Sequence, residues 1–246
     1  MLLLSKRFLD FLFPRTCVVC DCRLALDEEF LCPRCRMELP FEQIDTDWQH
    51  NRHLLRWIAE HPTLQRMGAL CIYQRQNAAA RLVHEVKFGR DYDLGVWMGR
   101  LAARRLRDSG LFDDVDALVP LPLSEHRLHQ RGFNQAEAIA KGLSEVLALD
   151  VRTDLIRRPC DRESQTHFHL HERFLNANNI FARAADVEVA DCHLMLVDDV
   201  MTTGATMMSA VETLEGLPGV RLSTFCWSWV RLSDREWTQA RQGSEA

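Results

Sequence analysis

One continuous segment in the C-terminal quarter of the chain most constrains its fold. Residues 194–197 (Leu-Met-Leu-Val) form an unbroken apolar run, which is typical of a strand buried on both faces. Two acids, Asp198 and Asp199, follow at once, and then come a short hydroxyl-rich loop and a helical pattern over residues 205–214. Strand, polar loop and helix in this order are the repeating unit of parallel sheets, so we expect an α/β fold.

The loop after the two acids has the properties of an anion-binding site. Ligands of open α/β sheets bind beyond the carboxyl ends of the strands, where the N–H groups that begin the next helix attract negative charge. Gly204 lets the backbone approach a ligand closely, the hydroxyls of Thr202, Thr203 and Thr206 add donors, and Ala205 completes the loop. Beside an anion the two carboxylates need partners of their own, which ribose hydroxyls and Mg²⁺ would supply. The competing interpretation is an ordinary helix start after a strand with an acidic end.

The rest of the chain alternates between apolar runs and helical patterns, as a parallel sheet requires. We expect strands near 67–73, 117–119, 155–156 and 221–230, the last as a closing strand with alternating burial, and helices near 1–13, 54–58, 77–87, 92–107 and 133–147. Residues 157–179 are polar and are predicted to form a long loop. We divide the chain into an N-terminal helix with a cysteine module (1–40), a hood or connecting region (41–110), the core (111–234) and a polar tail (235–246).

Composition excludes several classes of protein. Hydrophobic residues make up 47% of the chain, enough for a buried core, and the net charge of −5 argues against a protein that is basic throughout and binds nucleic acid by charge alone. The apolar N-terminus is interrupted by Lys6, Arg7 and Asp10 and is too short to span a bilayer. We therefore expect no stable membrane insertion and a cytoplasmic location.

Five of the nine cysteines lie between residues 17 and 35. Cys17 and Cys20 form one C-x-x-C pair, Cys32 and Cys35 form a second, and eleven residues separate the pairs. Two such pairs provide four thiolates for a tetrahedral, structural Zn²⁺ site. A redox-active disulfide pair is the alternative. Cys22 is interpreted as a free extra thiol, although it could replace Cys20.

The segment 194–206 resembles the signature of the type I phosphoribosyltransferases at every position. The resemblance implies that Asp198 and Asp199 hold the ribose hydroxyls of phosphoribosyl pyrophosphate (PRPP), which binds with Mg²⁺. It also implies that residues 202–206 cradle the 5-phosphate. The fold it implies is a parallel sheet flanked by helices, here with a small zinc module at the N-terminus.

A narrower resemblance covers nearly the whole chain. The string Arg131-Gly-Phe-Asn-Gln135 follows Val119-Pro-Leu-Pro-Leu123, and these, with the cysteine pairs, Lys87-Phe-Gly89 and Gln165, resemble the ComF/GntX proteins linked to DNA uptake and the use of external DNA. One departure is Arg162, which stands where the segment before Gln165 usually carries threonine. The resemblance implies a pyrophosphate-binding region that consists of Pro122, Arg131, Gly132 and Asn134. An arginine that only caps a helix or pairs with an acid is the alternative for Arg131.

Two functions are left open at this point. The first is a phosphoribosyltransferase, in which a nitrogen nucleophile displaces pyrophosphate from PRPP with Asp198, Asp199 and Arg131 as the catalytic groups. The second is a non-catalytic factor that senses PRPP or a nucleotide and binds single-stranded DNA or a DNA-uptake protein. The arginines at 157, 158 and 162 would suit the second, but the sequence shows no clear base-stacking platform. The acceptor, the oligomeric state and the role of the histidines at 167, 169 and 171 are not predicted.

Overall fold

The protein contains a five-stranded, fully parallel sheet. The computed structural model describes residues 13–42, 51–159, 180–185 and 188–231. Strands β1 (Leu64–Ile72), β7 (Arg221–Trp229), β6 (His193–Met201), β2 (Ala117–Pro120) and β3 (Asp150–Val151) lie in that spatial order, and each pairs in parallel with its neighbour. A separate two-stranded antiparallel sheet pairs β4 (Ile156–Arg157) with β5 (Ala182–Arg183).

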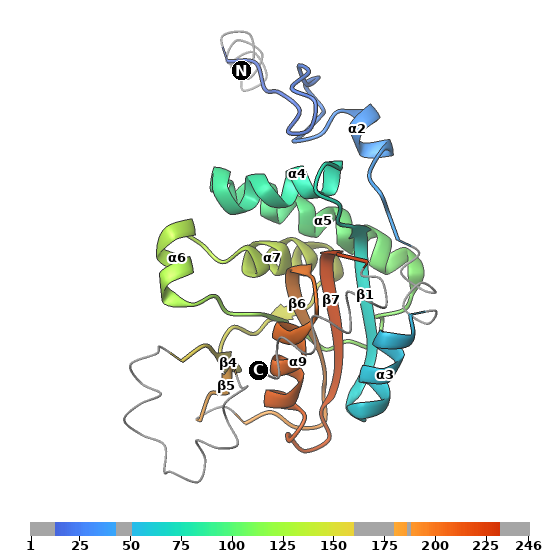
Figure 1. Ribbon diagram of the computed structural model, residues 1–246, viewed down its shortest axis with the longest axis vertical. Helices are drawn as coiled ribbons and strands as arrows, with labels where there is room; N and C mark the ends of the chain where they lie inside the picture. The colour runs from blue at the N-terminus through green and yellow to red at the C-terminus, as the bar shows by residue number, and fades with distance from the viewer. Residues whose placement is uncertain (1–12, 43–50, 160–179, 186–187, 232–246) are drawn as a thin grey trace.

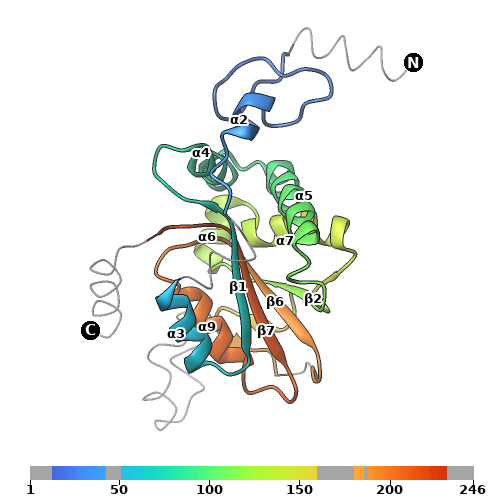
Figure 2. The same cartoon turned by 90° about the vertical axis from the view of Figure 1, so that its right-hand side faces the viewer.

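Helices cover both faces of the sheet (Figures 1 and 2). The bounds of the larger helices are α3 (Arg52–Glu60), α4 (Ala78–His84), α5 (Tyr92–Ser109), α6 (Glu125–Arg131), α7 (Gln135–Leu147) and α9 (Ala205–Leu214). Helices α4, α5 and α7 pack on one face, where Met195, Val197, Phe225 and Trp227 enter the core. Helices α3 and α9 pack on the other, against Leu194, Leu196 and Leu222. Burial on both faces explains the continuous apolar run of β6.

Two glycines allow α5 and α7 to cross at very short range. A Cβ built on Gly142 would lie 2.0 Å from the carbonyl oxygen of Val96, and one on Gly99 would lie 2.1 Å from that of Ile139. The backbones are therefore in direct contact, and a side chain at either position would push the helices apart.

The cysteine module packs on α4 and α5 rather than on the sheet. It contains the short helix α2 (Pro33–Met37), and its buried Leu24, Leu31 and Leu39 join the same apolar cluster as α4 and α5. The rings of Phe30 and Trp97 lie 5.8 Å apart across this contact, and the Arg81 guanidinium donates to the Val19 carbonyl. Figure 1 shows the module beyond α4, away from the strands.

The structure confirms the predicted fold class of a parallel α/β sheet flanked by helices, with a small cysteine module at the N-terminus. It corrects two details. Strand β7 is not an alternating closing strand, because it lies between β6 and β1 and is buried at every position after Arg221. Helix α6 was not predicted, since none of its residues is buried and it lacks an apolar stripe.

Some predictions fall outside the described residues: the helix near 1–13, most of the loop 157–179 with its three histidines, and the polar tail. Within the described ranges, no helix has both the length and the apolar character needed to cross a bilayer.

Candidate functional site

The carboxyl ends of β2 and β6 form a topological switch point. The two strands are neighbours, with Pro120 opposite Val197. From β2 the chain passes through α7, on one face, to β3, whereas from β6 it passes through α9, on the opposite face, to β7. Connections that diverge in this way leave a crevice between the two strand ends, and ligands of open α/β sheets bind there.

Asp198 and Asp199 lie near the carboxyl end of β6, as the sixth and seventh of its nine residues, at this crevice. Asp199 is buried, and its amide N–H donates to Asp198 Oδ1 at 2.8 Å. Burial and the neighbouring charge of Asp199 raise the pKa of Asp198 to about 7, while the cations Lys87 and Arg131 oppose the rise. Two carboxyl groups this close favour a ligand that brings hydroxyl donors or positive charge.

The predicted phosphate loop follows directly. Helix α9 begins at Ala205, and its N-cap, Gly204, has a φ of 76° and no capping side chain. The first N–H groups of α9 therefore have no side-chain cap apart from a weak bond between the Ala205 N–H and Thr203 Oγ1 at 3.5 Å. Thr202 is exposed, and Thr203 and Thr206 are half-buried. An uncapped helix start flanked by hydroxyls is a site suited to a phosphate group.

The predicted pyrophosphate region lies on the β2 side of the crevice. Arg131 ends α6, donates to Gln135 Oε1 at 2.7 Å and acts electrostatically on Asp198. Gly132, with a φ of 83°, is exposed and leads to α7, while Pro122 is half-buried after β2. Asn134 has a structural task, since its side chain caps α7 at the Ala136 N–H and donates to the Leu121 carbonyl at 3.0 Å.

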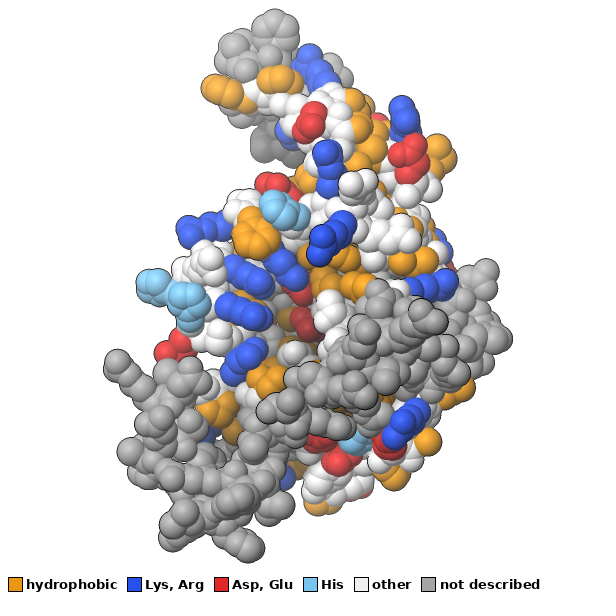
Figure 3. Space-filling model, viewed as in Figure 1, with side chains coloured by type: hydrophobic (Ala, Val, Ile, Leu, Met, Phe, Trp, Pro, Cys, Tyr) orange, Lys and Arg blue, Asp and Glu red, His pale blue; other side chains and the backbone are white. Residues whose placement is uncertain are grey.

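Lys87 contributes a cation from a distant part of the sequence. It lies in the π-helical turn η2 (Glu85–Gly89) between α4 and α5, and its Nζ is 3.1 Å from Asp199 Oδ2. Figure 3 shows Lys and Arg side chains gathered on this face around a hollow in which acidic side chains lie. The site thus combines two acidic side chains, two cationic side chains and an uncapped helix start.

Trp57 is a site residue that sequence analysis missed. A Cβ built on Gly204 would lie 1.9 Å from Cη2 of its indole, so the ring of this α3 residue lies directly against the phosphate loop. Its place in an apolar helical pattern indicated only a core residue. No local signal in the sequence could have paired it with Gly204.

The cysteine module gathers its thiols as a metal site requires. The Sγ atoms of Cys17, Cys20, Cys22 and Cys32 all lie within 4.8 Å of one another, so three of the four predicted ligands are in this quartet and Cys22 stands in it where Cys35 was expected. Cys35 lies beside the quartet and interacts with Cys20, Cys32 and Cys17. Backbone hydrogen bonds from Cys22 and Cys35 lower the pKa of Cys20 and of Cys32, respectively. Hydrogen bonds with Cys20 and Cys32 raise the pKa of Cys22 to about 12, and burial raises the pKa of Cys35. All of these thiols would ionise together only around a cation, and a Cys₄ set fits Zn²⁺. Cys22, predicted to be a free thiol, lies inside the cluster.

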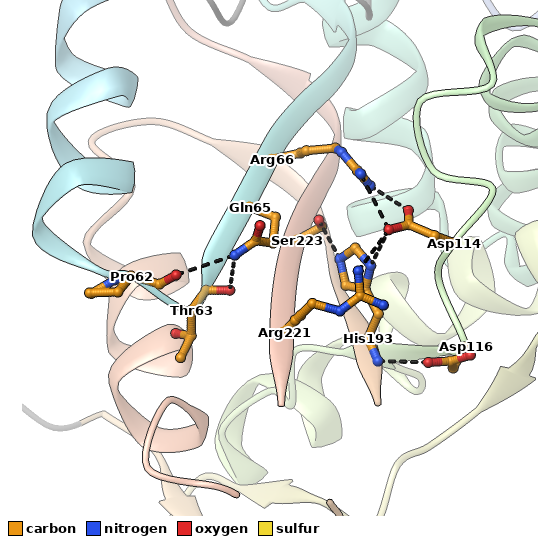
Figure 4. Close-up of polar contacts among 9 residues, drawn as sticks. All are labelled: Pro62, Thr63, Gln65, Arg66, Asp114, Asp116, His193, Arg221 and Ser223. Atoms are coloured by element: carbon orange, nitrogen blue, oxygen red, sulfur yellow. Dashed lines mark hydrogen bonds and ion pairs between the residues drawn. The ribbon is translucent and has the colours of Figure 1, made fainter. Parts of the chain in front are cut away.

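A second polar cluster lies at the opposite, amino-terminal end of the sheet (Figure 4). Ser223 Oγ is 2.8 Å from His193 Nε2, and His193 Nδ1 is 3.2 Å from Asp114 Oδ2. Asp114 also accepts from Arg66 and Arg221, and the backbone N–H of His193 donates to Asp116 Oδ2.

The order serine, histidine, aspartate in this cluster is that of a hydrolase triad. However, Ser223 and His193 are both fully buried, so no substrate can reach the hydroxyl. Burial lowers the pKa of His193, and the Arg66 hydrogen bonds hold the pKa of Asp114 well below its usual range. The cluster is therefore a structural tie between β1, the segment before β2, β6 and β7.

Comparison with known proteins gives relatives that span most of the chain, although no protein-family model matches it. The DNA utilization protein YhgH of Escherichia coli (strain K12) is 26% identical over 216 residues, which cover 85% of this chain and 89% of that protein. Competence protein F of Haemophilus influenzae is 24% identical over 82% of this chain and 91% of its own length. The competence protein ComFC of Bacillus subtilis is 35% identical over 100 residues, 39% of this chain and 37% of that protein.

Among solved structures, a crystal structure of an adenine phosphoribosyltransferase aligns with a TM-score of 0.36 and 16% identity, over 63% of this chain and 78% of that one. This similarity is too low to support any conclusion about the present chain. The relatives by sequence, at 24–27% identity, span at least four-fifths of this chain and 83–91% of their own length, and their names support the ComF family.

Proposed function

We propose that the crevice between β2 and β6 binds PRPP or a related phosphoribosyl ligand, and that the protein acts in the uptake, processing or use of external DNA. The observation that carries the proposal is the juxtaposition of Asp198 and Asp199 with the uncapped start of α9 at a switch point. The 5-phosphate would bind the N–H groups at residues 203–206, and the ribose hydroxyls would donate to the two carboxylates. The names of the relatives motivate the DNA role.

The arrangement suits displacement of pyrophosphate at C1 of the ribose. The bond from C1 to the pyrophosphate oxygen breaks, its electron pair leaves with pyrophosphate, and a nitrogen acceptor forms the new bond and loses a proton. Arg131, at the β2 side, would stabilise the departing charge, and the carboxylates would orient the ribose. Mg²⁺ binds carboxylate oxygens, so the acid pair fits the ion that accompanies PRPP. When bound, this ion would neutralise part of the negative charge of the pyrophosphate.

Calorimetric titration with PRPP and Mg²⁺ tests the binding proposal. Replacement of both Asp198 and Asp199 by Asn preserves shape and removes charge, so the double variant should lose binding. A matched control, Glu38→Gln, alters an exposed acid that pairs with Arg34 on the cysteine module, away from the strands, and should bind as the wild type does. No binding by a folded wild-type protein would refute the proposal. Release of pyrophosphate in a screen of nucleobases and amines would then identify the acceptor.

A second candidate function, direct binding of single-stranded DNA, is favoured by one surface next to the site. Phe88 and Tyr92 are 61% and 44% exposed, although aromatic rings are usually buried. Phe88 lies 4.7 Å from the His84 ring and Tyr92 lies 5.3 Å from the Phe133 ring. Arg90 lies between Phe88 and Tyr92 in the sequence, and Arg131 lies two residues before Phe133. Exposed rings beside cations are the combination that binds unpaired bases and phosphates.

Fluorescence anisotropy with a labelled oligothymidylate, measured over a salt series, tests this second function. Phe88→Ser should weaken binding by about tenfold, since the stacking of one base contributes about 1–3 kcal/mol. Met37→Ser removes another exposed apolar side chain, 80% exposed and on the cysteine module, and should have no effect. Equal affinity of Phe88→Ser and wild type, or affinity independent of salt, would refute this interface.

We also propose that the cysteine module holds one structural Zn²⁺ through Cys17, Cys20, Cys32 and Cys35. With four protein ligands the ion has no open position, so its role is to fix the module against α4 and α5. A site of free thiolates suits a reducing compartment such as the cytoplasm.

A further inference from the structure

The ion pair between Lys87 and Asp199 is unusually well shielded from water. The two side chains are 19% and 11% exposed, and their charged atoms are 3.1 Å apart. Removing both charges from water carries a large dehydration cost, which only close pairing offsets. A pair that joins residues so distant in sequence, at a ligand crevice, indicates a role beyond local stability.

The backbone around Lys87 is shaped to direct its side chain inward. Residues Glu85–Gly89 form a π-helical turn, a rare conformation that is frequent at functional sites. The Glu85 carboxylate lies over Gly89, where a Cβ would be 1.9 Å from Oε1. Arg90 then adopts a left-handed conformation, with φ of 58°, and donates to the Gln130 carbonyl at 2.6 Å. Such strain persists only where the surrounding contacts impose it, and here they place Lys87 toward Asp199 and leave Phe88 exposed.

Among its described residues, the crevice holds as many cationic side chains as acidic ones. Asp198 and Asp199 bring two acidic groups, and Lys87 and Arg131 bring two cations that act on them. A phosphorylated ribose adds negative charge at the nearby start of α9, which would repel an acid pair that had no counter-cation. In that case a divalent ion would have to be recruited before the sugar could bind.

We propose that Lys87 is a built-in counter-cation, which neutralises Asp199 so that the site binds the ribose 5-phosphate part of its ligand without a divalent metal ion. The inference rests on the proposed function, since it concerns the same ligand. It deepens that proposal, because it restricts the need for Mg²⁺ to ligands that carry pyrophosphate. Lys87 is thus a positioning residue that holds the acid pair ready for the ribose hydroxyls.

Calorimetric titration with ribose 5-phosphate, which lacks pyrophosphate, tests the role of Lys87. The wild type should bind equally well in Mg²⁺-free buffer and with millimolar Mg²⁺. Lys87→Met should bind at least about tenfold more weakly without Mg²⁺ and should regain affinity when Mg²⁺ is added. Lys87→Arg, which keeps the charge, should stay within a few-fold of the wild type in both buffers.

Lys141→Met is the matched control, because Lys141 is 56% exposed on α7 and pairs only weakly with Glu145; it should behave as the wild type. Thermal melting of each variant shows that the protein is folded. A merely structural ion pair would change the melting temperature but not the response to Mg²⁺. Unchanged Mg²⁺-free affinity in Lys87→Met, or a wild type that itself needs Mg²⁺ to bind ribose 5-phosphate, would overturn the inference. A wild type that binds neither ribose 5-phosphate nor PRPP, with or without Mg²⁺, would instead refute the proposed function.

Discussion

Replacing Gly204 with Ala probes the contact between the phosphate loop and Trp57. Gly204 has a φ of 76°, a left-handed conformation that costs a residue with a Cβ about 1–2 kcal/mol. The new Cβ would also lie 1.9 Å from Cη2 and 2.4 Å from Cζ3 of Trp57, so the indole must move, and overpacking of this kind costs about 1–3 kcal/mol. The expected loss in the free energy of unfolding is therefore about 2–5 kcal/mol.

A double-mutant cycle separates the two costs. In a Trp57→Ala background the clash is absent, so Gly204→Ala should cost only about 1–2 kcal/mol there. The expected coupling between the two substitutions is about 1–3 kcal/mol, measured from urea unfolding curves of the four proteins. Gly132→Ala provides the control, because Gly132 has a φ of 83° but a Cβ there would meet nothing within 4 Å.

Additivity of the two substitutions within about 0.5 kcal/mol would refute the contact between Trp57 and Gly204, since residues in contact should couple by more than this. A cost of Gly204→Ala no larger than that of Gly132→Ala would refute it as well. Either result would mean that Trp57 does not lie against the loop in solution.

Three further predictions concern pH, helix packing and metal. Burial holds the pKa of His193 below its unfolded value, so the unfolded state binds more protons as pH falls through about 6.5. The free energy of unfolding should therefore drop between pH 7 and 5, by at most about 1.4 kcal/mol per pH unit from this group. His193→Gln should flatten this pH dependence, and an unchanged pH dependence would contradict the lowered pKa. Gly142→Ala should lower the melting temperature although alanine is the better helix former, because its Cβ would meet the Val96 carbonyl at 2.0 Å; a rise in melting temperature would contradict the close crossing of α5 and α7. Purified protein should contain about one Zn²⁺ per chain. The Cys35→Ser variant should lose this ion to a chelator, whereas the Cys22→Ser variant should retain it. The reverse result would make Cys22 the fourth ligand beside Cys17, Cys20 and Cys32.

The phosphate segment could be predicted from sequence because its signals are local. Strand, acids, loop and helix follow one another between residues 194 and 214, and α9 spans Ala205–Leu214 as predicted. The strand is longer than predicted, because β6 continues to Met201 and includes both acids. The helix that starts after Asn77 was also predicted, because asparagine is a preferred N-cap residue. In the structure the Asn77 side chain accepts from the Ala80 N–H, as a cap does.

What sequence reasoning missed depends on contacts between distant residues or lacks an apolar pattern. Helix α6 has no buried residue, so periodicity could not reveal it. Lys87 stood out in the sequence only as part of the Lys87-Phe-Gly89 string, which gave no sign that it pairs with Asp199. The contact of Trp57 with Gly204 and the inclusion of Cys22 in the thiol cluster arise only when the chain folds. The interior position of β7, between β1 and β6, depends on sheet order, which no local pattern encodes.

The most direct test of the central claim is to locate the phosphate itself. Backbone amide resonances of the ¹⁵N-labelled protein, titrated with ribose 5-phosphate, should shift most at residues 203–206, and the same titration of the Asp198→Asn and Asp199→Asn double variant should leave them unmoved. That pattern is what the account predicts. Large shifts confined to the cysteine module or to α6, with the start of α9 unaffected, would contradict it.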